Sequence, residues 1–332
     1  MKDGNFHLDR AGLVLPNGLI TDGAPFPITP ELTAVVEEYR NREMIADYAM
    51  PFVSVGNMSF KYWQYPLKEG FANIETKVGR KGKPKVLEFT ATEATDSCVN
   101  HALDDDIPYD DIEDAPENHD PVTKAAQKLT NLMLTRREVI VASVVQDSAN
   151  YGSGYYHGCA AGEKFDNPDA DPIDLILTSL DIPIIRPNRL FFGQTGWRYL
   201  RTHPKVVKAV LGNSGDSGAA SKEQIAELFE VDSVHVGRAL YDTTKKGQTE
   251  SLALAWGSNV AMLYIDESAD ANGGITWGFT ARKAYQGANI WGGRKDDDSI
   301  GAKGGVKVRV GESRKEVVVA KKVGYLLTGV HA

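Results

Sequence analysis

The chain has 332 residues, of which 42% are hydrophobic and 25% are charged, so it is long enough for one large globular domain or two ordinary ones. Its formal net charge of -8 at pH 7 argues against nonspecific binding to nucleic acid, which needs concentrated Lys and Arg. It shows neither a signal peptide nor an apolar run of the roughly 20 residues that span a bilayer, so we expect a protein made and used in a cytoplasm.

Residues 1–28 are expected to form an extended arm, because turn-forming pairs and prolines interrupt this stretch every few residues. A helix follows directly. Thr29 is a suitable N-cap, and Pro30 stands at the first helical position, where a missing backbone N–H costs nothing.

Residues 54–96 predict a long two-stranded loop, called the long loop below. Its arms, 54–65 and 85–96, contain aromatic and β-branched residues that suit a pleated surface. The loop carries a basic tip, consisting of Lys77, Arg80, Lys81 and Lys83, and is followed by an acidic block that includes Asp104, Asp105, Asp106, Asp110, Asp111 and Asp114. Two-stranded ribbons are marginal in water unless they pack on something. We therefore predict that the basic tip packs against the acidic block of a neighbouring copy, although a charge run is also typical of a solvated face.

The longest helical pattern runs from Asp120 to about residue 149. Its apolar residues repeat at helical spacing, and its expected polar positions are Lys124, Lys128, Arg136, Arg137 and Glu138. At about 1.5 Å per residue this helix would be on the order of 40 Å long. Glycines from Gly152 onward are expected to end it.

Residues 171–265 predict a compact mixed α/β unit made of short alternating elements. The expected helices are 171–180, 194–211 (bent or split at Pro204) and 221–229, and the expected strands are 189–193, 232–236 and 259–265. Polar loops are expected at 212–220 and 243–249. The remaining chain predicts strands at 275–281, 306–310 and 316–323, with glycine-rich segments between them.

No catalytic motif is complete. Gly215-Asp216-Ser217-Gly218 matches the sequence around the nucleophile of chymotrypsin-like proteases, but the next residue is Ala219 and the required His motif is missing. A mobile loop is the preferred interpretation, and a serine hydrolase using Ser217 stays an alternative. Residues 268–279 fail the calcium-loop pattern at its first and twelfth positions. Cys98 and Cys159 are expected to be free thiols. We predict no cofactor, no metal and no enzymatic activity.

The order of these parts resembles the tailed-phage major capsid protein, whose fold is the Hong Kong 97 type. The segments that carry the resemblance are ITPELT at 28–33, FKYW at 60–63, VGRK at 78–81, HPKVVK at 203–208, QIAELF at 224–229, KGQT at 246–249 and VRVGES at 308–313. Each segment is short, but they are collinear over nearly the whole chain.

The resemblance implies an α+β fold with the following parts: an N-terminal arm (1–28), the start of the P-domain (29–53), the E-loop (54–96), the P-domain with its spine helix at 120–150 (97–170), the A-domain (171–265), and P-domain strands with the C-terminus (266–332). Loops of the A-domain meet around the symmetry axes in this family. The implied axial residues are Asn213, Asp216, Lys245 and Lys246.

The implied function is that of a coat subunit, which assembles into pentamers and hexamers of an icosahedral head around double-stranded DNA. The implied partners are further copies of the chain, with a separate scaffolding protein, portal, maturation protease and decoration protein as possible others. DNA would be enclosed without sequence-specific binding, no membrane would be involved, and assembly would take place in the host cytoplasm. An encapsulin-like compartment, which shares the fold, is the nearest alternative.

Overall fold

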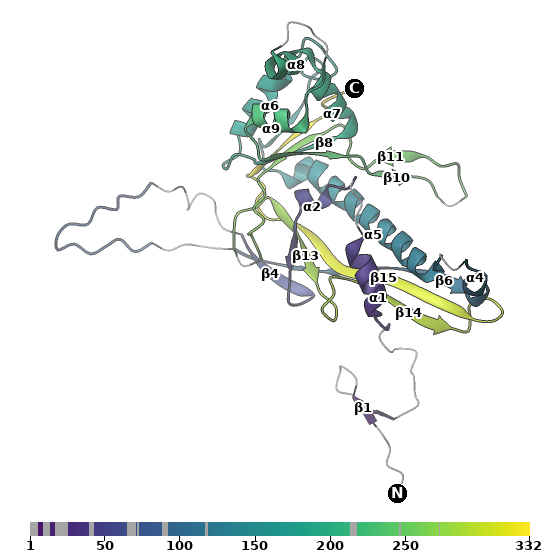
Figure 1. Ribbon diagram of the computed structural model, residues 1–332. Helices are drawn as coiled ribbons and strands as arrows, with labels where there is room; N and C mark the ends of the chain where they lie inside the picture. Colours follow the sequence, from purple (N-terminus) through teal and green to yellow (C-terminus); the bar gives the residue numbers. More distant parts are fainter. Residues whose placement is uncertain are drawn as a thin grey trace.

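The computed structural model describes residues 6–8, 14–16, 26–39, 43–64, 71, 73–87, 92–116, 119–212, 218–245, 247–271 and 273–332. Figure 1 shows an upper unit of helices around a sheet, and an elongated lower unit built on one long helix and a second sheet. The long loop leaves the molecule on one side, and a shorter hairpin leaves on the other. Apart from the strands β1 (Phe6–Leu8) and β2 (Val14–Pro16), most of the predicted N-terminal arm lies outside the described residues.

The lower unit forms because one stripe of the long helix is apolar. Helix α5 (Pro121–Gln146) begins at Asp120, whose carboxylate accepts hydrogen bonds from the backbone N–H groups of Val122 and Thr123. Ala126 and Met133 of α5 pack with Val308 and other valines of the sheet, as does α1 (Pro30–Glu38). The sheet order is β14 (Ile290–Asp297), β15 (Gly305–Val318), β13 (Gly278–Lys283) and β3 (Phe52–Ser54), and β6 (Val99–Pro108) also pairs with β15.

The ends of these elements differ in part from the predictions. Helix α5 ends at Gln146 and is followed by the 3-10 turn η1 (Ser148–Asn150), so the chain leaves the helix before the glycines expected to end it. The strand predicted at 316–323 is wrong as a single element. Its first residues complete β15, which ends at Val318, and the chain then turns before β16 (Gly324–Thr328).

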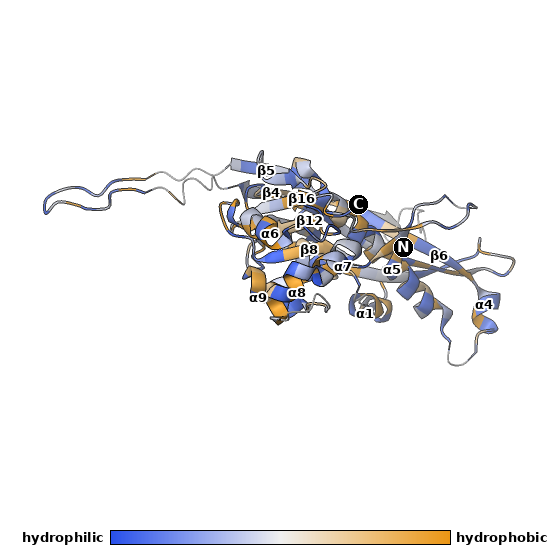
Figure 2. Ribbon diagram, turned by 90° about the horizontal axis from the view of Figure 1, so that it is seen from above, coloured by the Kyte–Doolittle hydropathy of each residue, from blue (hydrophilic) through white to orange (hydrophobic). Residues whose placement is uncertain are grey.

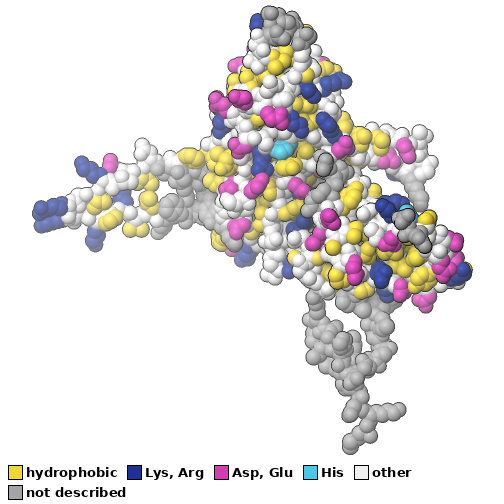
Figure 3. Space-filling model, viewed as in Figure 1, with side chains coloured by type: hydrophobic (Ala, Val, Ile, Leu, Met, Phe, Trp, Pro, Cys, Tyr) yellow, Lys and Arg dark blue, Asp and Glu magenta, His cyan; other side chains and the backbone are white. Residues whose placement is uncertain are grey.

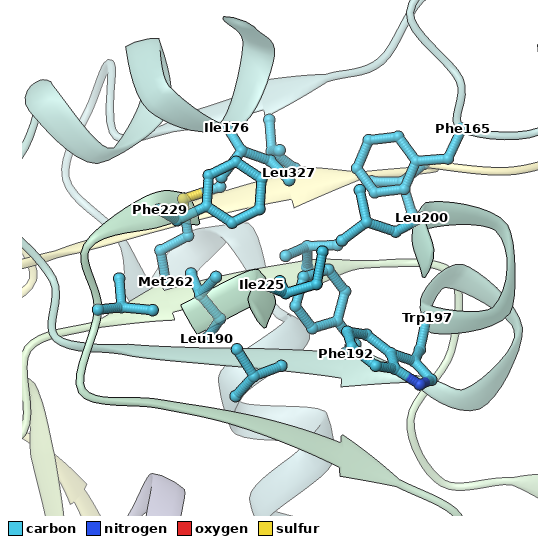
Figure 4. Packing of buried hydrophobic residues seen from close by; sticks show 14 of the residues in the cluster. Phe165, Ile176, Leu190, Phe192, Trp197, Leu200, Ile225, Phe229, Met262 and Leu327 are labelled. Atoms are coloured by element: carbon cyan, nitrogen blue, oxygen red, sulfur yellow. The ribbon is translucent and has the colours of Figure 1, made fainter. Parts of the chain in front are cut away.

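The upper unit contains a five-stranded sheet in the order β7 (Tyr156–Gly158), β16, β12 (Val260–Leu263), β8 (Arg189–Gly193) and β9 (Ser233–Gly237). Its helices are α6 (Pro172–Asp181), α7 (Gln194–Thr202), α8 (Pro204–Leu211) and α9 (Lys222–Phe229). The predicted break at Pro204 is confirmed, and Ser221 and Gln224 form a full capping box at the start of α9. Figure 4 shows how Phe229 and Ile176 point toward Met262 and Leu327 of the strands, which closes the core of this unit.

Strand β16 differs from its expected place. It pairs antiparallel with β12, and its Leu327 lies in the upper core, so the end of the chain packs with residues 171–265 rather than with the strands after residue 265. A short return strand of this kind cannot be placed from sequence, because its partners lie more than 60 residues earlier in the chain.

Among its described residues, the long loop is paired near its base. Strands β4 (Ser59–Gln64) and β5 (Thr92–Ser97) run antiparallel in register, from the pair Ser59 and Ser97 to the pair Gln64 and Thr92. The arms predicted as strands over 54–65 and 85–96 are therefore longer than the observed pairing. Residues 73–87 extend the loop far beyond the rest of the molecule (Figure 2), and Val86 is 90% exposed. Of residues 73–87, all except the half-buried Ile74 are exposed, whereas Phe60 at the base of the loop is buried against its own chain.

Three smaller elements complete the part of the chain that is described: α2 (Ala46–Ala49), α4 (Tyr109–Glu113), and the hairpin of β10 (Leu240–Asp242) and β11 (Leu252–Leu254). Within the described ranges, the helices are all too short or too polar to cross a membrane.

Candidate assembly surfaces

The basic tip is a solvated cluster of positive charge. Lys77, Arg80, Lys81 and Lys83 are all exposed, and none of them forms an ion pair with another described residue. The backbone N–H of Gly82 donates to the carbonyl oxygen of Gly79 at 2.8 Å, which closes the turn between them. Figure 3 shows these cations gathered at the far end of the long loop, with little negative charge beside them.

Half of the acidic block is already neutralised within the chain. Asp104 and Asp106 lie on β6 directly opposite Arg309 and Lys307 of β15. The Asp104 carboxylate accepts two hydrogen bonds of 2.6 Å from the Arg309 guanidinium, and Lys307 Nζ lies 3.6 Å from an Asp106 oxygen. Asp110, on α4, pairs with Lys303. These three carboxylates therefore stabilise the fold of their own subunit.

The other half lines an open groove. Asp105, Asp111 and Asp114 border a groove of about 490 Å³ between β6, α4 and the first turns of α5, with Lys124 and Lys128 on its helix side, and the paired Asp106 also reaches its edge. Side chains alternate along a strand, so Asp105 points to the opposite face from Asp104 and Asp106. Within the described residues, none of these three carboxylates forms an ion pair. This acidic groove is thus the part of the acidic block that remains available to a partner.

The basic tip and the acidic groove lie at opposite ends of the molecule. In Figures 1 and 2 the long loop extends to the left, whereas α4 and the end of β6 lie at the far right. A subunit cannot bring its own tip into its own groove. Any contact between these two surfaces must therefore join different copies of the chain.

A buried carboxylate that sequence reasoning placed on the polar face of the helix joins three parts of the molecule. Glu138 of α5 is fully buried and accepts hydrogen bonds from the backbone N–H of Ile45 (2.9 Å), the backbone N–H of Ala46 (2.8 Å) and the indole Nε1 of Trp256 (2.6 Å). Burial raises the pKa of Glu138, while the hydrogen bonds from Ile45, Trp256 and Ala46 act in the opposite direction. The sequence held one signal of this burial: an acidic residue occupies a helix position on the same side as the apolar stripe.

The adjacent Arg137, also predicted as a polar position of the helix, is buried too. Its guanidinium pairs with Asp47, donates to the carbonyl oxygen of Met50 at 3.1 Å, and lies 3.9 Å from the centre of the Phe52 ring. The guanidinium of Arg282 lies on the same ring at 3.1 Å. These contacts anchor β3, from which the long loop begins.

Of the four expected axial residues, one lies within the described residues. Asn213, Asp216 and Lys246 lie outside the described residues, and Lys245 is exposed in the turn between β10 and β11. In Figure 1, α8 lies at the top of the upper unit, whereas the β10–β11 hairpin projects to the right from its base. The axial role of these four residues stays a prediction.

The described residues contain no candidate centre for metal chemistry. Within the described ranges, no group of three or more His, Cys, Asp or Glu side chains is arranged to hold a metal ion. Ser217, the alternative nucleophile, lies outside those ranges. Cys98 is buried and Cys159 is half-buried, and both are free thiols, as expected.

A long helix on a sheet, a projecting two-stranded loop and a separate α/β unit define the class of proteins that have the Hong Kong 97 type of fold. Solved structures support this fold. A phage-related protein from Bordetella bronchiseptica RB50 matches with a TM-score of 0.73, covering 92% of this chain and 98% of that chain at 21% identity. The capsid structure of cyanophage P-SCSP1u matches with a TM-score of 0.55, covering 94% and 92% at 10% identity.

The sequence narrows this class further. No family model matches the chain. The major capsid protein of Pseudomonas phage JBD67 is 41% identical over 306 residues, which cover 91% of this chain and 96% of that protein. The chain therefore belongs to the family of phage major capsid proteins, which are structural components of the virion that associate with copies of themselves. The encapsulin-like compartment becomes the lesser alternative, since it shares the fold alone.

Proposed function

We propose that this chain is the coat subunit of a tailed phage, and that it assembles into pentamers and hexamers of an icosahedral head around double-stranded DNA. The long loop takes the part of the E-loop, and α5 that of the spine helix. One observation carries the proposal: the basic tip at one end of the subunit and Asp105, Asp111 and Asp114 of the acidic groove at the other end are opposite in charge, and neither group is paired within the described residues. Such a subunit is complementary to its own copies in a head-to-tail arrangement, which gives a ring when the rotation between successive copies closes.

In this proposal the basic tip of one copy lies against the acidic groove of the next. Of the six predicted acidic residues, Asp105, Asp111 and Asp114 would make the contact, because Asp104, Asp106 and Asp110 are engaged within their own subunit. Exposed ion pairs contribute only about 0 to 1 kcal/mol each. Each contact is repeated many times over a closed shell, so even weak pairs can set the register of neighbouring subunits.

The experiment reverses two charges of the tip. Arg80→Glu with Lys81→Glu removes about two pairs and adds repulsion of similar size, which amounts to roughly 2 kcal/mol per contact, or about 30-fold weaker association. The folded subunit should be unaffected, because neither side chain contacts the rest of its own chain. Sedimentation and negative-stain electron microscopy would measure assembly, and urea unfolding would measure the stability of the subunit.

Two further variants make the result specific. Arg80→Lys with Lys81→Arg keeps both charges and should assemble normally. Adding Asp111→Lys and Asp114→Lys to the reversed tip should restore assembly, because the opposite charges face each other again. Normal shells from the reversed tip alone would refute the pairing, and failure of the wild-type chain to assemble with its head partners would refute the coat-subunit proposal itself.

The remaining partners belong to the same proposal. A separate scaffolding protein, a portal, a maturation protease and a decoration protein would act during assembly in the host cytoplasm. Packaged DNA would be enclosed without base-specific contacts, and the net charge of -8 suits a lining from which DNA must also leave. The chain would act by assembly and not by catalysis.

A further inference from the structure

The β10–β11 hairpin carries leucines on one face, beside Asp242, and two of these leucines are exposed within the described part of the chain. The two strands form a sheet of their own, and no third strand of the described residues pairs with them. Leu240 lies opposite Leu254, and Leu252 follows on the same face because side chains alternate along a strand. Leu240 is 52% exposed and Leu252 is 61% exposed. An isolated ribbon with leucines on one face is marginal in water, so it is expected to have a covering surface.

The root of the hairpin is fixed to the rest of the subunit. The backbone N–H of Ala255 donates to the carbonyl oxygen of Ala239 at 2.9 Å, and Gln146 of α5 donates to the carbonyl oxygen of Ala255 at 3.1 Å. The indole N–H of Trp256, the next residue, donates a hydrogen bond to Glu138, which also lies on α5. The hairpin therefore projects in a direction set by the long helix.

The far part of the hairpin is held in shape by its own polar groups. A single carboxylate oxygen of Asp242 accepts hydrogen bonds from the backbone N–H of Thr244 at 2.9 Å and from its hydroxyl at 2.7 Å. Across the ribbon, the hydroxyl of Thr243 donates to the carbonyl oxygen of Ser251 at 2.9 Å. An arm that is already ordered loses little conformational freedom when it binds, which favours a docking role over that of a loose loop.

The direction of the hairpin points to a second copy of the chain as the covering surface. Figure 1 shows the hairpin leaving the molecule on the side opposite to the long loop. In a head-to-tail ring, the copy that receives the long loop turns its hairpin side toward the copy that sent it. We infer that each hairpin packs, through Leu240 and Leu252, against a neighbouring copy of the chain. This inference rests on the proposed coat function.

The first test is a cross-link from the hairpin. Leu252→Cys is introduced into the full-length chain together with Cys159→Ser, since Cys98 is buried, and a maleimide photo-cross-linker is attached. Particles are assembled from a mixture of isotope-labelled and unlabelled subunits, so that mass spectrometry separates contacts between copies from contacts within one copy. We expect cross-links between copies in particles and none in dissociated subunits. Particles in which the probe reacts only within its own copy, only with another component, or not at all would overturn the inference.

The second test weakens the apolar face. Leu240→Ser with Leu252→Ser should raise the protein concentration needed for assembly at least tenfold and leave the urea midpoint of the subunit unchanged. Leu211→Ser, which alters a 42% exposed leucine on α8, is the matched control and should assemble like the wild type. If the double variant and the wild type assemble at the same concentration, the hairpin inference fails while the coat function stands. If the wild type forms no particles with its head partners, both fail.

Discussion

Replacing Glu138 by alanine should destabilise the subunit more than any exposed substitution. The variant removes the acceptor for the N–H groups of Ile45, Ala46 and Trp256, and all three of those residues are at least 95% buried. A buried donor left without a partner costs about 1 to 3 kcal/mol. A cavity of about 140 Å³ already borders Glu138, so water can enter and recover part of this loss. We expect a net loss of roughly 3 to 6 kcal/mol, which is a large share of the 5 to 15 kcal/mol typical of domains.

Two matched variants separate the contributions of the three bonds. Glu138→Gln keeps one oxygen as an acceptor but loses the charge and turns its amide group toward a donor, so we expect a loss of about 2 kcal/mol. Trp256→Phe removes a single bond and should cost a similar amount. The double variant of Glu138→Ala and Trp256→Phe should be less destabilised than the sum of its parts, because both changes remove the same hydrogen bond.

The assay is equilibrium unfolding of dissociated subunits in urea. The slope of the transition is compared among variants, because an unchanged slope means that a shifted midpoint reports a change in stability. The expected order of stability is wild type, then Glu138→Gln and Trp256→Phe together, then Glu138→Ala. A loss below about 1 kcal/mol for Glu138→Ala, or strict additivity with Trp256→Phe, would show that Glu138 does not hold these three segments together.

Two further predictions concern the core near Trp256. Burial, with Arg189 and Lys222 nearby, lowers the pKa of His235 to about 4, so the unfolded chain takes up a proton first and stability should fall as the pH drops from about 6.5 to 4. His235→Phe should remove that part of the pH dependence in urea midpoints, and an unchanged profile would contradict the assignment. Gly237→Ala would place a methyl group 2.1 Å from the Trp256 ring, and thermal melting should show a loss of about 1 to 3 kcal/mol that the open-space control Gly162→Ala does not share.

Elements whose signals are local could be predicted from the sequence. Helix α5 starts where Asp120 and Pro121 predict it, the strand Arg189–Gly193 is found at its predicted bounds, and the Ser221 capping box starts α9. Each of these depends on residues within a few positions of one another. The basic tip could likewise be recognised as unpaired and exposed, because no residue near it in sequence could cover it.

Strand β6 could not be predicted, because several of its residues have a low propensity for the strand conformation. Asp is depleted in strands, and Asp104, Asp105 and Asp106 follow one another in the middle of this one. The cations that compensate Asp104 and Asp106 are Arg309 and Lys307, about 200 positions later in the chain. Because β6 and β15 are so far apart in sequence, the sequence could not show which residues of the acidic block are paired and which are unpaired. The pairing of β6 with β15 in the structure shows it.

The acidic residues of β6 also explain how a subunit with an exposed strand edge can avoid pairing with unrelated strands. One edge of β6 pairs with β15, and no strand of the described residues covers the other edge over its ten residues. An open edge of this length would pair with almost any strand unless charge prevents it. Two such edges would repel each other through Asp105, because Asp104 and Asp106 are already paired with Arg309 and Lys307. A segment rich in Lys and Arg meets no such repulsion, so the same residues that fix the register of β6 within the subunit favour a basic partner outside it.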